Sequence, residues 1–71
     1  MEKEIGSFEK NSVESVKLYL TSYKGKNLLE IRIWCLDKNG NWLRTYKGLC
    51  IGTHLINNLK DLLEKALQET H

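Results

Sequence analysis

The chain has 71 residues, of which 41% are hydrophobic and 28% are charged, and its formal net charge is +2. This length corresponds to one small domain that buries only about 60% of its unfolded surface, so a partner chain would help to stabilise it. No apolar run of 18 residues and no basic-then-apolar leader occurs, so we expect no membrane association and a cytoplasmic, nucleoid-associated or nuclear protein, not a secreted one.

Basic residues are concentrated in the middle of the chain. Residues 16–52 contain seven lysines and arginines against two acidic residues, a net charge of +5, whereas residues 1–15 carry −2 and residues 53–71 carry −1. A concentrated positive segment attracts a polyanion more strongly than the modest total charge indicates. We therefore interpret residues 1–71 as one domain whose central part suits an anionic partner.

Alternation of apolar and polar residues predicts strands through most of this basic segment. Residues 1–11 alternate weakly and predict an edge strand or an ordered arm, whereas residues 14–51 carry the main sheet of three to four strands. In residues 14–23 the inward side chains are aliphatic: Val16, Leu18 and Leu20. The outward side chains of that strand are basic, aromatic or hydroxylic: Lys17, Tyr19, Thr21 and Tyr23.

Turns with glycine separate the following strands. Gly25 supplies the positive φ that a turn needs, and Asn39-Gly40 suits a second tight hairpin.

Residues 27–37 direct Leu29, Ile31, Ile33 and Cys35 inward and Glu30, Arg32 and Trp34 outward. Residues 41–51 have Trp42, Arg44 and Tyr46 on one side and Leu43 and Thr45 on the other. Gly48 predicts a bulge, after which Leu49 and Ile51 turn toward the core.

The periodicity changes to that of an amphipathic helix over residues 53–69, with Thr53 as the expected N-cap. Its apolar side chains form two adjacent stripes. One stripe is Leu55, Leu59, Leu62 and Ala66, and the other is Ile56, Leu63 and Leu67. The first can cover the inner face of the sheet, and the helix of a second copy is the simplest cover for the second, in a two-fold homodimer. In the alternative, the sheet curls enough to cover both stripes.

The cysteines and histidines form no recognisable metal or catalytic pattern. Cys35 and Cys50 lie 15 residues apart without a CxxC pair, and His54 and His71 are the sole histidines. We interpret both cysteines as small buried hydrophobic residues, with a disulfide or a reactive thiol as the alternative. Cys50, Thr53 and His54 are close in sequence but lack an orienting third group, so we expect no enzymatic activity, metal or cofactor.

The outward face interleaves rings with cations, which is the composition that single-stranded nucleic acid requires. The rings are Tyr19, Tyr23, Trp34, Trp42 and Tyr46, and the cations are Lys17, Lys24, Lys26, Arg32, Arg44 and Lys47. Unpaired bases stack on rings for about 1–3 kcal/mol each, and the phosphates between them bind cations. Any one of these residues is explained by strand propensity or solvation, but the whole set favours a binding surface. A protein-interaction module for an acidic partner and a single-stranded RNA-binding protein are the alternatives.

Short motifs in a particular order indicate a family. They are the aromatic-Lys-Gly-Lys run from Tyr23 to Lys26, "LLEIR" at 28–32, Asp37 followed by Gly40, Lys47-Gly48 and the leucine-rich helix. Over about residues 12–67 the sequence resembles the positive cofactor four family of transcriptional coactivators. The resemblance implies an α+β fold, in which four antiparallel strands precede one helix, and a homodimer formed through that helix. It also implies sequence-tolerant binding of single-stranded DNA, with the transcription or replication machinery as further partners.

Carried over by position, the resemblance implies DNA contacts by Tyr23, Lys24, Lys26, Arg32 and Lys47. The family's strand-end aromatic does not match, because Cys35 holds its position and Trp34 precedes it. Either Trp34 stacks from the outer face or that contact has been lost. The roles of Lys17, Tyr19, Trp42, Arg44 and Tyr46 rest on alternation alone. No serine-rich arm is present, which indicates a minimal bacterial, archaeal or viral relative.

Overall fold

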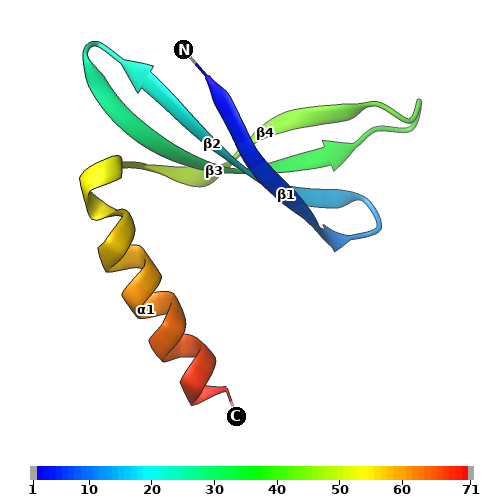
Figure 1. Ribbon diagram of the computed structural model, residues 1–71. Helices are drawn as coiled ribbons and strands as arrows, with labels where there is room; N and C mark the ends of the chain where they lie inside the picture. Colours follow the sequence, from blue (N-terminus) through cyan, green and yellow to red (C-terminus); the bar gives the residue numbers. More distant parts are fainter. Residues whose placement is uncertain (1, 71) are drawn as a thin grey trace.

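The computed structural model describes residues 2–70, so Met1 of the predicted strand or arm and His71 lie outside the described residues. The elements are β1 (Lys3–Asn11), β2 (Glu14–Tyr23), β3 (Lys26–Leu36), β4 (Trp42–Gly52), the 3₁₀ turn η1 (Thr53–Leu55) and α1 (Ile56–Glu69). Within these residues the strands form one antiparallel sheet in the order β1-β2-β3-β4, and α1 extends away from it (Figure 1). The predicted α+β class, four antiparallel strands and a C-terminal helix, is confirmed.

The turn between β2 and β3 is a two-residue hairpin. Tyr23 pairs with Lys26, and both connecting residues have positive φ, 51° at Lys24 and 78° at Gly25. This pattern is that of a type I′ turn, whose twist matches that of the flanking strands. The turn therefore needs two left-handed residues, one more than the glycine predicted from the sequence.

The turn between β3 and β4 is longer than the predicted Asn39-Gly40 hairpin. Asp37 Oδ1 accepts hydrogen bonds from the backbone N–H groups of Asn39 (2.8 Å) and Asn41 (2.9 Å). Gly40 has a positive φ of 84°. Asn39 does not, because Lys24 is the one non-glycine with positive φ among residues 2–70. The predicted turn and the positive φ are confirmed at Gly40 but not at Asn39, and the Asp37 carboxylate holds the turn.

A bulge in β4 precedes Gly48. Arg32 pairs with Gly48 and Trp34 pairs with Arg44, so three residues of β4, 45–47, stand opposite Ile33. Thr45 Oγ1 donates to the Ile33 carbonyl oxygen at 2.7 Å and accepts from the Lys47 N–H at 3.1 Å, which fixes the extra residues. Gly48 has a φ of 144°, and a Cβ there would lie 2.1 Å from the Ile31 carbonyl oxygen. Glycine is therefore required where β4 rejoins β3.

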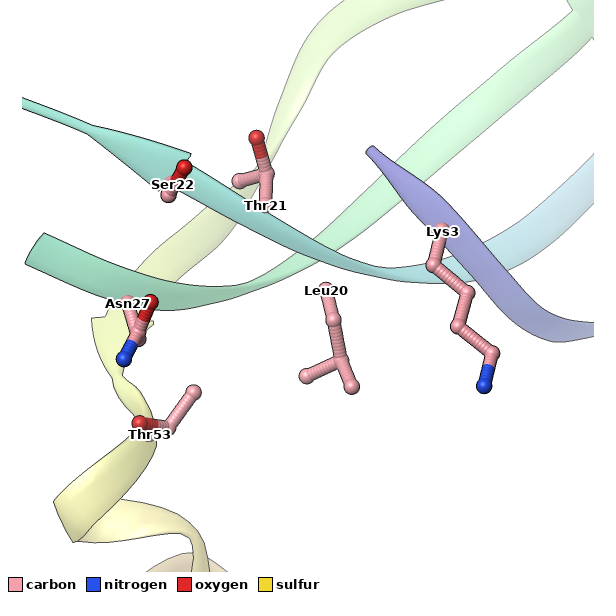
Figure 2. A pocket seen from close by; sticks show the side chains of 6 residues that line it. All are labelled: Lys3, Leu20, Thr21, Ser22, Asn27 and Thr53. Carbon is pink, nitrogen blue, oxygen red and sulfur yellow. The ribbon is translucent and has the colours of Figure 1, made fainter. Parts of the chain in front are cut away.

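The sheet has one face on the side of the helix and one open face. Figure 2 shows Leu20 and Lys3 projecting toward the side where Thr53 leads into the helix, whereas Thr21 projects to the other side. These residues and Ser22 and Asn27 line a hollow of about 370 Å³. Because paired residues of antiparallel strands share a face, the register assigns the other side chains. The helix-side face carries the aliphatic residues Val16, Leu18, Leu20, Leu29, Ile31, Ile33, Leu49 and Ile51.

The two cysteines are free thiols, and their predicted burial is wrong for Cys50. Cys50 is exposed on the open face, where it pairs with Glu30 across β3 and β4. Cys35 is half-buried on the helix-side face, opposite Glu14 and Leu43.

The helix begins later and lies farther from the sheet than the sequence predicts. Thr53 is not its N-cap, because residues 53–55 form η1, in which the Ile56 N–H donates to the Thr53 carbonyl oxygen. No residue of α1 is buried, so neither apolar stripe covers the sheet of its own chain, and the alternative of a curled sheet covering both is also wrong. The chain leaves β4 through η1 and α1 runs outward (Figure 1). No helix within residues 2–70 is long and apolar enough to span a membrane.

Candidate nucleic-acid interface

The open face gathers most of the ring-bearing and basic residues predicted from alternation. On β2 and β3 the cross-strand pairs Lys17–Arg32, Tyr19–Glu30 and Tyr23–Lys26 lie on it. The pairs of Trp34 with Arg44 and of Leu36 with Trp42 add two residues of β4. Side chains from three consecutive strands thus meet on the side away from the helix.

The centre of the open face is a buried carboxylate between two arginines. Glu30 is 7% exposed, and its Oε1 accepts hydrogen bonds from Arg32 Nε (3.1 Å) and Arg44 Nη2. Arg32 is anchored a second time, because its Nη1 donates to the Tyr46 carbonyl oxygen of the bulge at 3.0 Å. Arg44 Nη1 also lies 3.9 Å from Glu2 Oε2. We call Arg32 and Arg44 the arginine pair.

A hollow of about 410 Å³ lies beside the arginine pair. Arg32, Arg44, Thr45 and Tyr46 line it, so the bulge forms one of its walls. Its volume falls within the range of about 300–1,000 Å³ that ligand clefts occupy. Two guanidinium groups at an open hollow are suited to an oxyanion, because their planar donors match carboxylate and phosphate oxygens.

The rings near the middle of β2 and β3 pack on one another. Tyr19 and Trp34 have ring centroids 6.4 Å apart, and Lys17 Nζ lies 4.0 Å above the Trp34 ring. Tyr19 is 6% exposed, so the prediction that it offers an open stacking surface is wrong. Burial and then the charges of Glu4 and Glu2 raise the pKa of Tyr19, which keeps its hydroxyl protonated. Tyr19 instead supports the half-buried Trp34, whose Nε1 lacks a hydrogen-bond partner among the described residues.

Two of the accessible rings lie at strand ends, and the third lies on the bulge of β4. Tyr23 is 63% exposed at the β2–β3 turn, Trp42 is 38% exposed at the start of β4, and Tyr46 is fully exposed on the bulge. Lys24 Nζ lies 5.3 Å from the Tyr23 ring centroid, and Lys26 and Lys47 are exposed. The structure thus separates the predicted rings into an accessible set, Tyr23, Trp42 and Tyr46, and an inner pair, Tyr19 and Trp34.

Comparison with known proteins assigns a family to this arrangement. The family description "Transcriptional Coactivator p15 (PC4)" matches residues 10–62, well over half of the chain. The chain belongs to the PC4 family. The resemblance to positive cofactor four predicted from the motifs is confirmed.

Solved structures of PC4-like proteins share the fold. A PC4 homologue from Burkholderia pseudomallei, in its orthorhombic crystal form, has a TM-score of 0.85 at 22% identity, over 94% of this chain and 90% of that chain. The bacteriophage T5 homologue of the eukaryotic coactivator PC4, implicated in recombination-dependent DNA replication, has a TM-score of 0.74 at 25% identity, over 97% of this chain and 80% of that one. The search of curated proteins returned no match.

The residues carried over from the PC4 pattern do not form one compact cluster. Tyr23, Lys24 and Lys26 lie at the β2–β3 turn, Arg32 lies in the middle of β3 and Lys47 lies in the β4 bulge. Lys26 and Arg32 are six positions apart, which is about 20 Å along a strand. Their arrangement is therefore an extended track.

Sequence reasoning missed the role of Glu30. It assigned Glu30 to the outward face but gave it no partner, although Glu30 and Arg32 are two residues apart on one strand. Residues at this spacing share a face of a sheet, so their contact was predictable from the sequence. The contact with Arg44 depends on the β3–β4 register and the bulge, which the sequence did not specify.

Proposed function

We propose that this PC4-family protein binds single-stranded DNA, without marked sequence preference, on the open face of its sheet. The observation that carries the proposal is the presence of exposed rings on both sides of the arginine pair, on the face opposite the helix. Bases of an unpaired strand stack on such rings, and its phosphates bind the cations between them. Duplex DNA hides those base faces, so we expect it to compete poorly.

The length of the surface suits an extended strand. From Lys26 at the turn to Trp34 is eight residues, or about 26 Å of β3. Tyr23 and Lys24 stand at one end of this track, and Trp42 and Tyr46 stand near the other. We propose that the DNA backbone follows β3, with the accessible rings stacking on bases and the arginine pair contacting phosphates.

We further propose a binding protein without catalytic activity that acts in transcription or DNA replication. Membership of a family of transcriptional coactivators supports the first role. Similarity to the bacteriophage T5 homologue, itself implicated in recombination-dependent replication, supports the second. A binding surface made of rings and arginines serves either process, because neither role requires the protein to read a sequence.

We propose that the protein is a homodimer through α1. Leu62, Leu63 and Leu67 are 61–65% exposed in the single chain, and an isolated helix of 14 residues is marginally stable in water. A second copy would cover these leucines and stabilise the helix. Sedimentation should give about twice the 8.3 kDa chain mass. Leu63→Glu should produce monomers and Gln68→Glu, on the same helix, should not; a monomeric wild type at high concentration would contradict the proposal.

The binding proposal is tested by fluorescence anisotropy of a labelled oligo-dT titrated with the protein at several salt concentrations. We expect binding at low salt, with log Kd depending on log salt with a slope of about 0.7 per phosphate contacted. Lys24→Gln at the turn should lower this slope by about 0.7, the value for one phosphate contact, whereas Lys60→Gln on the helix should leave the slope unchanged. Absence of binding at low salt would refute the proposal, and stronger competition by oligo-U than by oligo-dT would reassign it to RNA.

A further inference from the structure

The carboxylate between the arginines is unusual for a surface proposed to bind DNA. Glu30 is nearly inaccessible, yet two guanidinium groups donate to the same oxygen, Oε1. A carboxylate removed from water is costly unless it is paired and hydrogen-bonded, and these two donors supply that compensation. Glu30 therefore interacts strongly with the arginine pair.

Glu30 presents the arginine pair with the same chemistry as a DNA phosphate. Carboxylate and phosphate oxygens both accept the planar N–H donors of arginine, so they compete for the same positions. Of the donors on Arg32, Nε is bonded to Glu30 and Nη1 to the Tyr46 carbonyl oxygen. The three side chains Glu30, Arg32 and Arg44 together carry a charge of +1, half that of the arginine pair alone.

Holding the two arginines in place does not by itself explain why residue 30 carries a charge. Arg32 is held independently by the bulge carbonyl of Tyr46, so it does not depend on Glu30 for its position. Arg44 is about half exposed and reaches the hollow from β4. An uncharged acceptor at position 30 could hold both guanidinium groups without reducing their net charge.

We propose that Glu30 is a built-in counter-ion that competes with DNA phosphate for the arginine pair and thereby limits the affinity for single-stranded DNA. The inference rests on the proposed function and concerns the regulation of the same surface. A phosphate entering the hollow takes over donors that Glu30 occupies. Glu30 acts through Arg32 and Arg44 and need not touch the DNA.

The test is Glu30→Gln, which keeps the size and an acceptor oxygen but removes the charge. We expect oligo-dT to bind this variant about five- to thirtyfold more tightly, because one like charge a few ångströms from the phosphate is lost. The salt dependence should steepen by about 0.7, one further phosphate contact. Glu2→Gln is the matched control, because Glu2 also lies near Arg44 but is half exposed, so its removal should change affinity less than threefold.

Two further measurements separate competition from a structural role. In an Arg44→Gln background the gain from Glu30→Gln should shrink, because the competition acts through the arginine pair. In the wild-type protein the Arg32 Nε–Hε resonance should shift when oligo-dT is added, a readout that does not depend on how well the variant folds. Equal or weaker binding by a folded Glu30→Gln variant, or an unmoved Arg32 resonance with bound DNA, would overturn this inference alone. Absence of binding by both wild type and variant would refute the proposed function.

Discussion

Replacing Gly48 with alanine tests whether the close approach of β4 to β3 sets the geometry of the sheet. The added Cβ would lie 2.1 Å from the Ile31 carbonyl oxygen and 3.0 Å from Arg32 Cα. Both are backbone atoms of an inner strand, so no change of rotamer relieves the clash. The φ of 144° at Gly48 is, in addition, a conformation that residues with a side chain rarely adopt.

The expected loss of stability follows from the steric clash with β3 and from the strained backbone conformation at residue 48. A residue held in a sparsely populated backbone conformation costs about 1–3 kcal/mol, and separation of the strands at Arg32 adds to this. We expect Gly48→Ala to lower the free energy of unfolding by about 3–5 kcal/mol, within the range seen for steric strain. At roughly 0.05–0.15 kcal/mol per residue, the whole chain has about 4–11 kcal/mol available, so the loss is severe.

Urea unfolding followed by circular dichroism measures this loss, at one fixed protein concentration because a dimer makes stability depend on concentration. Gly6→Ala is the matched control, because a Cβ at Gly6 meets nothing within 4 Å, and its effect should stay within about 1 kcal/mol. A Gly48→Ala variant as stable as the Gly6→Ala variant would refute the reasoning. It would mean that β3 and β4 can separate at the bulge at little cost.

Three further predictions concern stacking, turn chemistry and pH. Tyr23→Ala should weaken oligo-dT binding by about 1–3 kcal/mol in fluorescence anisotropy, and Tyr23→Phe should not, because the exposed ring supplies the stacking surface. Asp37→Ala should lower the free energy of urea unfolding by about 0.5–2 kcal/mol, whereas Asp37→Asn keeps an acceptor for the two turn N–H groups. Because the pKa of Tyr19 is raised in the folded state, stability should fall as pH rises above the ordinary tyrosine pKa toward the raised value. Unfolding measured against pH should show this loss in the wild type and not in Tyr19→Phe.

Much of the fold could be predicted from the sequence because strand and helix periods are local properties. Alternation through residues 14–51 fixed which side chains share a face, and the change to a helical period marked where the sheet ends. The same alternation assigned Arg32, Trp34, Trp42 and Arg44 to one face, which the cross-strand register confirms. The order of the short motifs along the chain was enough to indicate the PC4 family.

Exposure and contact depended on the tertiary structure. Alternation states which side a residue faces, but the packing of neighbours across strands decides whether water reaches it. Tyr19 is buried beside Trp34 for this reason, whereas Cys50 on the same face is exposed. The direction of α1 likewise depends on the 3₁₀ turn at residues 53–55, where a few backbone dihedrals determine the path of the following helix.

The sequence by itself determined the four strands, the terminal helix and the basic, ring-bearing character of one face. Only the tertiary structure showed that Glu30 joins Arg32 to Arg44, because that contact needs the bulge at residues 45–47 to set the register of β4 against β3. Local patterns specify which side chains share a face. The distance between charges on neighbouring strands depends on how those strands are aligned, and this alignment places Arg44 against the Glu30 carboxylate.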